Sequence, residues 1–247
     1  DQPSSEAIYE APTQVFSGTG ADAFDLQNTT LSFERHSATE YKVSSTSTTW
    51  TTFSSAGWTQ WVAGDDVTTN IAFVGGTLTY YGTAGIADIH LNSNGNLTFV
   101  SGDTNYAESY TQHFTLKRLS FLFNDLNPSA GGQIWYKEDG NKFFEVAFID
   151  VQEYGTTNIV NCIVTIYFNN HSTASLQNKI TFQYGTVNIL DGIVGISNGS
   201  IPGDISNPGI DISSNTLDSG ALTYEIDSTL TYSYLQEYNK SSLQNID

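Results

Sequence analysis

Short runs of alternating apolar and polar side chains are the feature that most limits the fold of this chain. Ile180, Phe182 and Tyr184 are large and apolar, whereas the residues between them are polar, and residues 144–148 alternate in the same way. Successive side chains of a β-strand point to opposite faces of the sheet, so this pattern predicts strands with one buried face. No long segment combines apolar residues at helical spacing with a cap and strong helix formers.

Turn residues and one fully apolar run complete this pattern. The Asn-rich and Gly-containing stretch 92–96 predicts a hairpin between residues 86 and 100. Apolar side chains on both faces of residues 162–168 predict a central strand covered on both sides, with Cys162 as a small buried apolar residue. The sequence therefore predicts an all-β protein, an antiparallel, jelly-roll-like β-sandwich with little or no helix.

The chain has 247 residues, and no linker or repeat divides it. We expect one β-sandwich domain over residues 21–247, preceded by an N-terminal extension over residues 1–20. An extended segment can complete the exposed edge of a neighbouring sheet. Residues 6–16 are therefore predicted as an exchanged strand through which copies of the protein assemble.

The charge of the chain excludes several classes of partner. It carries 26 acidic and 8 basic residues, a formal net charge of -18. Binding to a nucleic-acid backbone or an anionic membrane requires clustered Lys and Arg, so neither is an expected partner. No apolar run approaches the roughly 20 residues of a transmembrane helix. The start at Asp1 and the absence of Met fit a removed secretory leader, and we expect an extracellular or cell-surface location.

Oxygen donors crowd several predicted loops, which makes calcium the most plausible cofactor. None of these loops has the spacing of an EF-hand, and Asx turns would explain the same residues. Asp65 and Asp66 form one such loop. The residues predicted to bind calcium are Asp103, Asn105, Asp125 and Asn127.

No catalytic residue is predicted. Residues 195–199 match the G-x-S-x-G nucleophile elbow, but a turn sequence instead of a helix follows Ser197, and no histidine comes later in the chain. The four histidines are scattered, without the spacing of a zinc site. Paired carboxylates that hydrolyse glycosides leave no local signature, so a polysaccharide-active enzyme stays an alternative.

An aromatic set could stack on sugar rings, because flat apolar faces beside polar groups often bind ligands. The alternative is that these side chains pack in the core or at its rim. The set consists of Trp50, Trp58, Trp61, Tyr80 and Tyr81.

Several motifs between Leu91 and Asp204 occur together in one known family. They read NSNGNLTF at 92–99, SGDTNY at 101–106, FLFNDLNPSAGG at 121–132, VQEYGTTN at 151–158 and DGIVGIS at 191–197. In these motifs the chain resembles secreted bacterial β-sandwich modules with a pattern related to the nidogen-type extracellular domain. The resemblance implies an accessory or surface module attached to secreted hydrolases or cell-surface proteins. It supplies no catalytic residues.

We therefore expect a non-catalytic, extracellular structural or adhesive protein of a cell surface, with self-association by β-strand addition into a filament or coat. Its partners would be other copies of itself, or glycans or proteins of a surface. The first alternative is a carbohydrate-binding accessory module of a secreted hydrolase, and the second is a polysaccharide-active enzyme.

Overall fold

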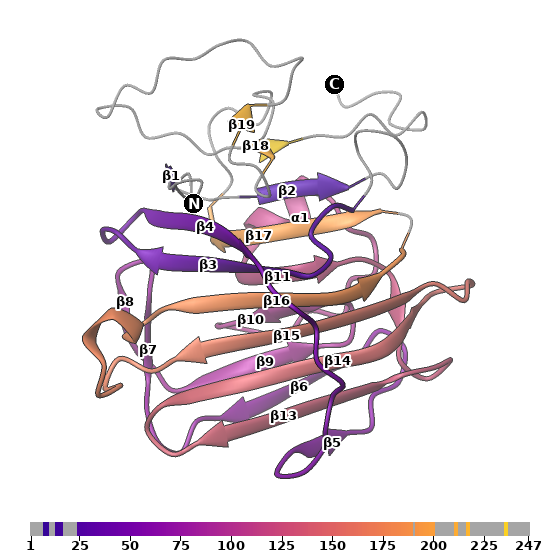
Figure 1. Cartoon of the computed structure of the whole chain (residues 1–247), viewed down its shortest axis with the longest axis horizontal. Helices are drawn as coiled ribbons and strands as arrows, with labels where there is room; N and C mark the ends of the chain where they lie inside the picture. Colours follow the sequence, from indigo (N-terminus) through magenta and orange to yellow (C-terminus); the bar gives the residue numbers. More distant parts are fainter. Residues whose placement is uncertain are drawn as a thin grey trace.

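Two large β-sheets pack face to face and enclose one apolar core (Figure 1). The computed structural model describes residues 24–189 and 191–200, together with the backbone of five short strands outside these ranges. The predicted all-β sandwich is confirmed, with antiparallel pairing throughout the two large sheets except for β20 against β2. Strands cover most of the described residues because β-branched and aromatic residues alternate with polar ones along them.

The first sheet has nine strands in the order β1-β4-β3-β16-β15-β14-β13-β5, with β12 paired to β14. Its strands are β1 (Ala7–Tyr9), β3 (Thr29–Arg35), β4 (Tyr41–Ser47), β5 (Thr59–Trp61), β12 (Leu126–Asn127), β13 (Gln133–Asp139), β14 (Phe143–Glu153), β15 (Ile159–Tyr167) and β16 (Ile180–Val187).

The second sheet has seven strands in the order β20-β2-β17-β11-β10-β9-β6. Its strands are β2 (Thr13–Phe16), β6 (Thr68–Ala72), β9 (Asp88–Asn92), β10 (Asn96–Thr98), β11 (Lys117–Phe123), β17 (Gly192–Asn198) and β20 (Leu235–Gln236). Two small hairpins pair β7 (Leu78–Tyr80) with β8 (Thr83–Ile86) and β18 (Ile210–Asp211) with β19 (Thr216–Leu217).

The core forms where the apolar faces of the two sheets meet. The predicted alternation in β16 and β14 is confirmed, because Phe182 and Phe148 are fully buried on the inner face. Phe121 of β11 contacts both rings from the opposite sheet, at centroid distances of 6.4 and 4.8 Å. Burying such aromatic side chains stabilises the sandwich by about 2 kcal/mol each.

The central strand β15 is covered less completely than its sequence predicts. Cys162 is buried, as expected, and burial raises the pKa of its thiol well above the ordinary value. Ile163 and Tyr167, on the opposite face, are only half-buried. The outer face of the nine-stranded sheet is therefore partly open.

Among the described residues, one segment, residues 48–58, crosses this outer face. We call it the strap. It leaves β4, runs in front of β16, β15 and β14, and enters β5 (Figure 1). The Trp50 ring lies directly over Gly185 of β16, where a Cβ atom would come within 2.4 Å of the indole. Glycine at this position thus lets the ring lie against the backbone of the sheet.

The predicted hairpin between residues 86 and 100 is confirmed as β9 and β10, but its turn is buried instead of exposed. Gly95 has a φ of 68°, and a Cβ atom there would lie 1.9 Å from the Leu122 carbonyl oxygen. The turn therefore requires glycine both for its conformation and for its contact with β11. Asn94 extends from the turn toward the neighbouring loops.

Helix is limited to short pieces within the described residues. α1 (Tyr110–Thr115) begins at Ser109, whose side chain accepts a hydrogen bond from the Gln112 N–H at 3.2 Å, and η2 (Ala174–Leu176) is a single 3-10 turn. None of the helices described here has the length and apolar character needed to cross a membrane.

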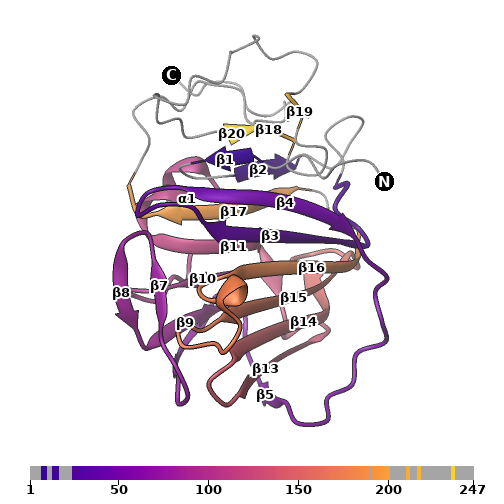
Figure 2. The same cartoon turned by 60° about the vertical axis from the view of Figure 1, so that its left-hand side comes forward.

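The N-terminal segment pairs with its own chain. β1 lies antiparallel to β4 at one edge of the nine-stranded sheet, and β2 lies antiparallel to β17 in the other sheet. Figure 2 shows both strands at the top of the sandwich. Exchange of this segment between copies stays a prediction.

Candidate functional site

A cavity of about 500 Å³ lies between the strap and the outer face of the nine-stranded sheet. The strap contributes one wall and strands β13 to β16 contribute the floor. The half-open outer face described above is thus hollowed at the point where the strap crosses it. The lining residues are Trp50, Thr52, Phe53, Ser55, Gln133, Ile149, Asp150, Asn161 and Thr186.

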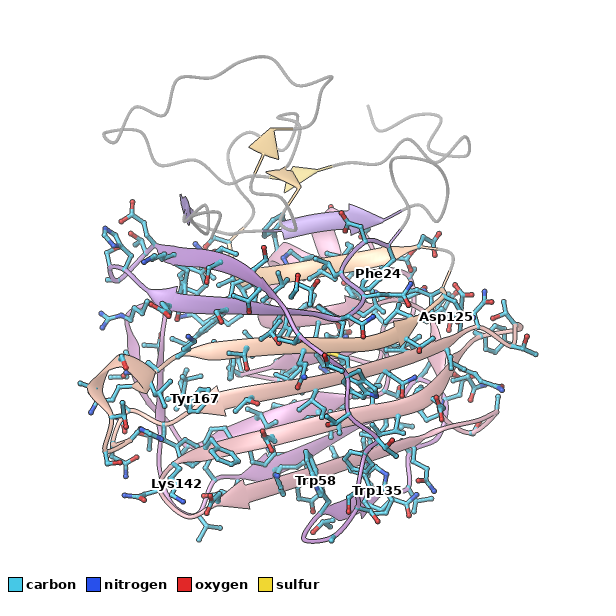
Figure 3. The ribbon with its side chains drawn as sticks, viewed as in Figure 1. Phe24, Trp58, Asp125, Trp135, Lys142 and Tyr167 are labelled. Carbon is cyan, nitrogen blue, oxygen red and sulfur yellow. The ribbon has the colours of Figure 1, made fainter. Side chains whose placement is uncertain are left out.

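Aromatic side chains form the strap side of this cavity. Trp50 is held over Gly185, as described above, while Phe53 packs against two tryptophans at the far end of the strap. The Phe53 ring centroid lies 5.2 Å from that of Trp58 and 6.1 Å from that of Trp135. Figure 3 labels Trp58 and Trp135, which lie close together beside β13. The cavity therefore has a rigid apolar wall built from neighbouring rings.

The floor of the cavity is polar. Asp150 and Asn161 bind each other twice: the Asp150 N–H donates to Asn161 Oδ1 at 3.1 Å, and Asn161 Nδ2 donates to Asp150 Oδ1 at 2.9 Å. Gln133, Thr186 and the strap hydroxyls add further donors and acceptors. An apolar wall beside a few fixed polar groups is the usual construction of a small-molecule site.

The predicted sugar-stacking set is divided by the fold. Tyr80 and Tyr81 are buried in the core, and Trp61 packs partly against it, as the core-packing alternative predicted. Trp50 and Trp58 remain on the outer face. Sequence reasoning missed Phe53 and Trp135 as their partners, although Trp135 sits on the outward face of β13 because Ile134 points inward.

A second cluster lies at another part of the molecule, where three carboxylates meet. Asp65 and Asp66 precede β6, and Asp125 lies between β11 and β12; one oxygen of each lies within 4.8 Å of the others. Figure 3 shows Asp125 well away from Trp58. Asn94, from the buried hairpin turn, donates to Asp66 Oδ1 at 2.8 Å and accepts from the Leu126 N–H at 3.1 Å.

Electrostatic repulsion is strong in this acidic cluster. Burial raises the pKa of Asp125 to about 6, and the surrounding carboxylates add to the rise. Those carboxylates belong to Asp66, Asp65 and Glu153. Burial and the charge of Asp66 also raise the pKa of Asp65.

Three of the four residues predicted to bind calcium have hydrogen-bonding or ion-pair partners within the protein. Asp103 forms an ion pair with Arg118, with 2.6 Å between Oδ2 and Nη2, and its Oδ1 accepts from the Asn105 N–H. The Asn105 side chain accepts from the Ala107 N–H. Asn127 Oδ1 accepts from residues 129 and 130 in the Asx arrangement that was the stated alternative.

Only Asp125 of the predicted calcium set joins a group of carboxylates. Its companions, Asp65 and Asp66, form the third acidic loop identified from the sequence. Three carboxylates offer hard oxygen ligands of the kind that calcium takes, although calcium takes six to eight oxygens in all. Calcium binding stays a prediction.

Replacing Asp125 by asparagine is expected to stabilise the protein at pH 8 by about 1 kcal/mol, after allowance for solvent screening. The folded-state pKa of Asp125 is raised to about 6 from 3.8, so folding disfavours the ionised carboxylate. The stability contributed by this group is therefore fully present below pH 3.8 and is lost as the pH rises through 6. Urea unfolding of both proteins at pH 5 and pH 8, in chelator, measures the difference.

Asp88→Asn serves as the control for this prediction, since Asp88 lies in β9 and is not one of the three clustered carboxylates. An equal gain for Asp125→Asn at both pH values would show that ionisation is not the cause. With calcium chloride in place of the chelator, calcium is expected to stabilise the unmodified protein more than it stabilises the Asp125→Asn variant. A transition that calcium leaves unchanged in both proteins would contradict the calcium prediction.

Comparison with known proteins finds no family model, no curated protein and no solved structure that matches this chain.

Proposed function

We propose that this protein is a non-catalytic, glycan-binding β-sandwich that attaches to carbohydrate at a cell surface. The cavity under the strap carries this proposal. It joins two alternatives from the sequence, an adhesive surface protein and a carbohydrate-binding module, because adhesion through glycans needs only one binding surface.

The shape and chemistry of the cavity fit a sugar unit. Sugar rings have an apolar face formed by C–H groups and an edge of hydroxyls. Trp50 and Phe53 offer flat apolar surfaces, and Asp150, Asn161 and Gln133 offer hydrogen-bonding groups. A volume of about 500 Å³ falls within the range of ordinary ligand pockets.

Binding without cleavage is supported by the number of carboxylates in the cavity. Most glycosidases need two, one as acid and one as base or nucleophile, about 5–10 Å apart. Asp150 is the one carboxylate among the residues that line this cavity. Asp150 alone, in the cavity floor, can accept a hydrogen bond from a sugar hydroxyl but does not form such a pair.

Replacing Trp50 or Phe53 by alanine is expected to weaken binding to the glycan recognised by the protein about fivefold or more, because loss of an aromatic contact costs about 1–3 kcal/mol. The measurement is affinity electrophoresis in gels containing neutral and acidic polysaccharides, followed by calorimetry on the best ligand. Tyr106→Ala is the matched control, since Tyr106 is an exposed aromatic residue that does not line the cavity.

Gly185→Ala tests the same site without removing an aromatic ring. The added methyl group would lie 2.4 Å from the Trp50 indole, so the ring must move off the sheet. We expect this variant to fold and to lose binding. The proposed function would be rejected if no polysaccharide slowed the migration of the protein. It would also be rejected if the Trp50→Ala and Tyr106→Ala variants were slowed equally. Release of reducing ends from a bound polysaccharide would instead favour the enzyme alternative.

A further inference from the structure

We propose that Asp150 makes this cavity select glycans that lack acidic groups. This inference rests on the proposed glycan-binding function and names the class of ligand. Its basis is that the fold places one carboxylate in the cavity floor, at a point where the strand pairing is irregular.

The backbone at Asp150 is irregular in two ways. Its φ of 51° lies in the left-handed region, which residues other than glycine adopt rarely and at a cost of about 1–3 kcal/mol. The pairing of β14 with β15 also shifts register between Phe148 and Val151, as in a β-bulge. Bulges are frequent beside functional sites, where they redirect a side chain.

The neighbouring strand is adapted to this conformation. Gly132 precedes β13 with a φ of 84°, and a Cβ atom there would lie 2.3 Å from the Asp150 carbonyl oxygen. Glycine at position 132 therefore lets the bulged backbone at Asp150 lie close to the chain before β13. Gly132, just before β13, thus accommodates the backbone conformation that directs Asp150 toward the cavity.

Asn161 fixes the carboxylate itself. It is only 6% exposed, and its amide donates to Asp150 Oδ1 while also contacting the Thr186 carbonyl oxygen at 3.3 Å. Oδ1 is thereby held, and Oδ2 has no hydrogen bond from the described residues. An ionised carboxylate accepts hydrogen bonds and donates none, so Oδ2 is suited to accept a sugar hydroxyl.

The charge of the cavity explains the selection. Its lining contains no Lys or Arg to offset Asp150, and the whole chain has a formal charge of -18. A uronate or sulfate group placed beside Asp150 would meet direct repulsion at short range. A neutral sugar would meet only the acceptor.

The test uses hexasaccharides of glucose, mannose and galactose, each compared with its uronic acid counterpart, and a glucosamine hexamer. Calorimetry gives the dissociation constants for the unmodified protein and for Asp150→Asn. Asparagine tolerates positive φ and keeps an acceptor for Asn161, so the fold of the variant should be preserved. Measurement of the unmodified protein in 1 M salt is a second test that needs no variant, because salt screens the repulsion.

The expected result is that at least one neutral hexamer binds at least about tenfold more tightly than its uronate. Asp150→Asn should reduce this ratio to less than about threefold, and 1 M salt should reduce it as well. An unchanged ratio in the variant would overturn the role of Asp150 while leaving glycan binding intact. The glucosamine hexamer, which also lacks acidic groups, should bind more tightly than any uronic acid hexamer, and the reverse order would overturn the role of the Asp150 charge. Failure of every hexamer and polysaccharide to bind would reject the proposed function itself.

Discussion

Asp103→Asn is expected to lower the free energy of unfolding by about 3 kcal/mol, because it leaves a buried guanidinium without its ionised partner. Arg118 is 0% exposed, and the Asp103 carboxylate lies 2.6 Å from its Nη2 atom. Arg118 also donates to Asn96 Oδ1 at 2.6 Å and to the Gln112 carbonyl oxygen at 3.1 Å, and these neutral acceptors cannot replace the lost charge. Urea unfolding at pH 7.5 measures the loss.

Two further variants separate charge burial from general damage at this pair. Asp103→Asn combined with Arg118→Met removes both charges, and should recover part of the stability lost by Asp103→Asn alone. Asp139→Asn breaks an exposed pair, Lys142 with Asp139 at 3.0 Å, and should cost less than about 1 kcal/mol. A similar loss for Asp139→Asn and Asp103→Asn would show that burial does not set the cost.

Acidification from pH 7.5 to pH 5 is expected to destabilise the protein by about 2 kcal/mol through His113 alone. Burial lowers the pKa of His113 from 6.5 to about 3, and the charge of Arg118 contributes. The unfolded chain therefore binds a proton that the folded chain excludes between these pH values. Stability from this group is fully present above pH 6.5 and is lost as the pH falls toward 3.

The His113→Gln variant should be less stable than the unmodified protein at pH 7.5, since Nδ1 of His113 lies 2.8 Å from Ser120 Oγ in the core. Its stability should nevertheless fall about 2 kcal/mol less between pH 7.5 and pH 5. His36→Gln, at an exposed site, should keep the full pH dependence. If the His113→Gln variant kept the pH dependence of the unmodified protein, other groups would be responsible for the acid sensitivity. Asp125 could not be one of them, because its raised pKa favours the folded state at low pH.

The predictions for Asp103 and His113 concern residues that pack around β11 and the buried hairpin turn. These residues do not line the candidate cavity. Arg118, Asn96 and Asp103 tie the turn to β11 and to the loop after β10. The cavity under the strap lies on the other sheet. Loss of stability and loss of binding can therefore be measured separately.

Much of the fold could be predicted from the sequence because alternation reports which side of a strand faces the core. This holds for residues 144–148 and 180–184, and the hairpin at 86–100 follows from its turn residues. The six-residue helix α1 is too short to show a helical period. The burial of the turn at 92–96 could not be predicted, because residues distant in sequence cover it.

The candidate cavity was predicted only in part. Trp50, Trp58, Tyr80 and Tyr81 belong to one aromatic set for which sugar stacking and core packing were both open, and Tyr80 and Tyr81 are buried. Asp150 carries no motif, and its importance comes from a positive φ and from the side chain of Asn161 across the strand pair. A pattern of residue types shows neither the backbone angle at Asp150 nor its neighbour on the adjacent strand.

The amino-acid sequence by itself determined the class of fold and the strand faces, because these follow from the local periodicity of apolar residues. Tertiary structure alone decided which acidic loops meet, which aromatic rings stay at the surface and where the strap crosses the sheet. Those features depend on contacts between strands far apart in the chain. The register of strand pairing sets such contacts, and local side-chain patterns do not encode it.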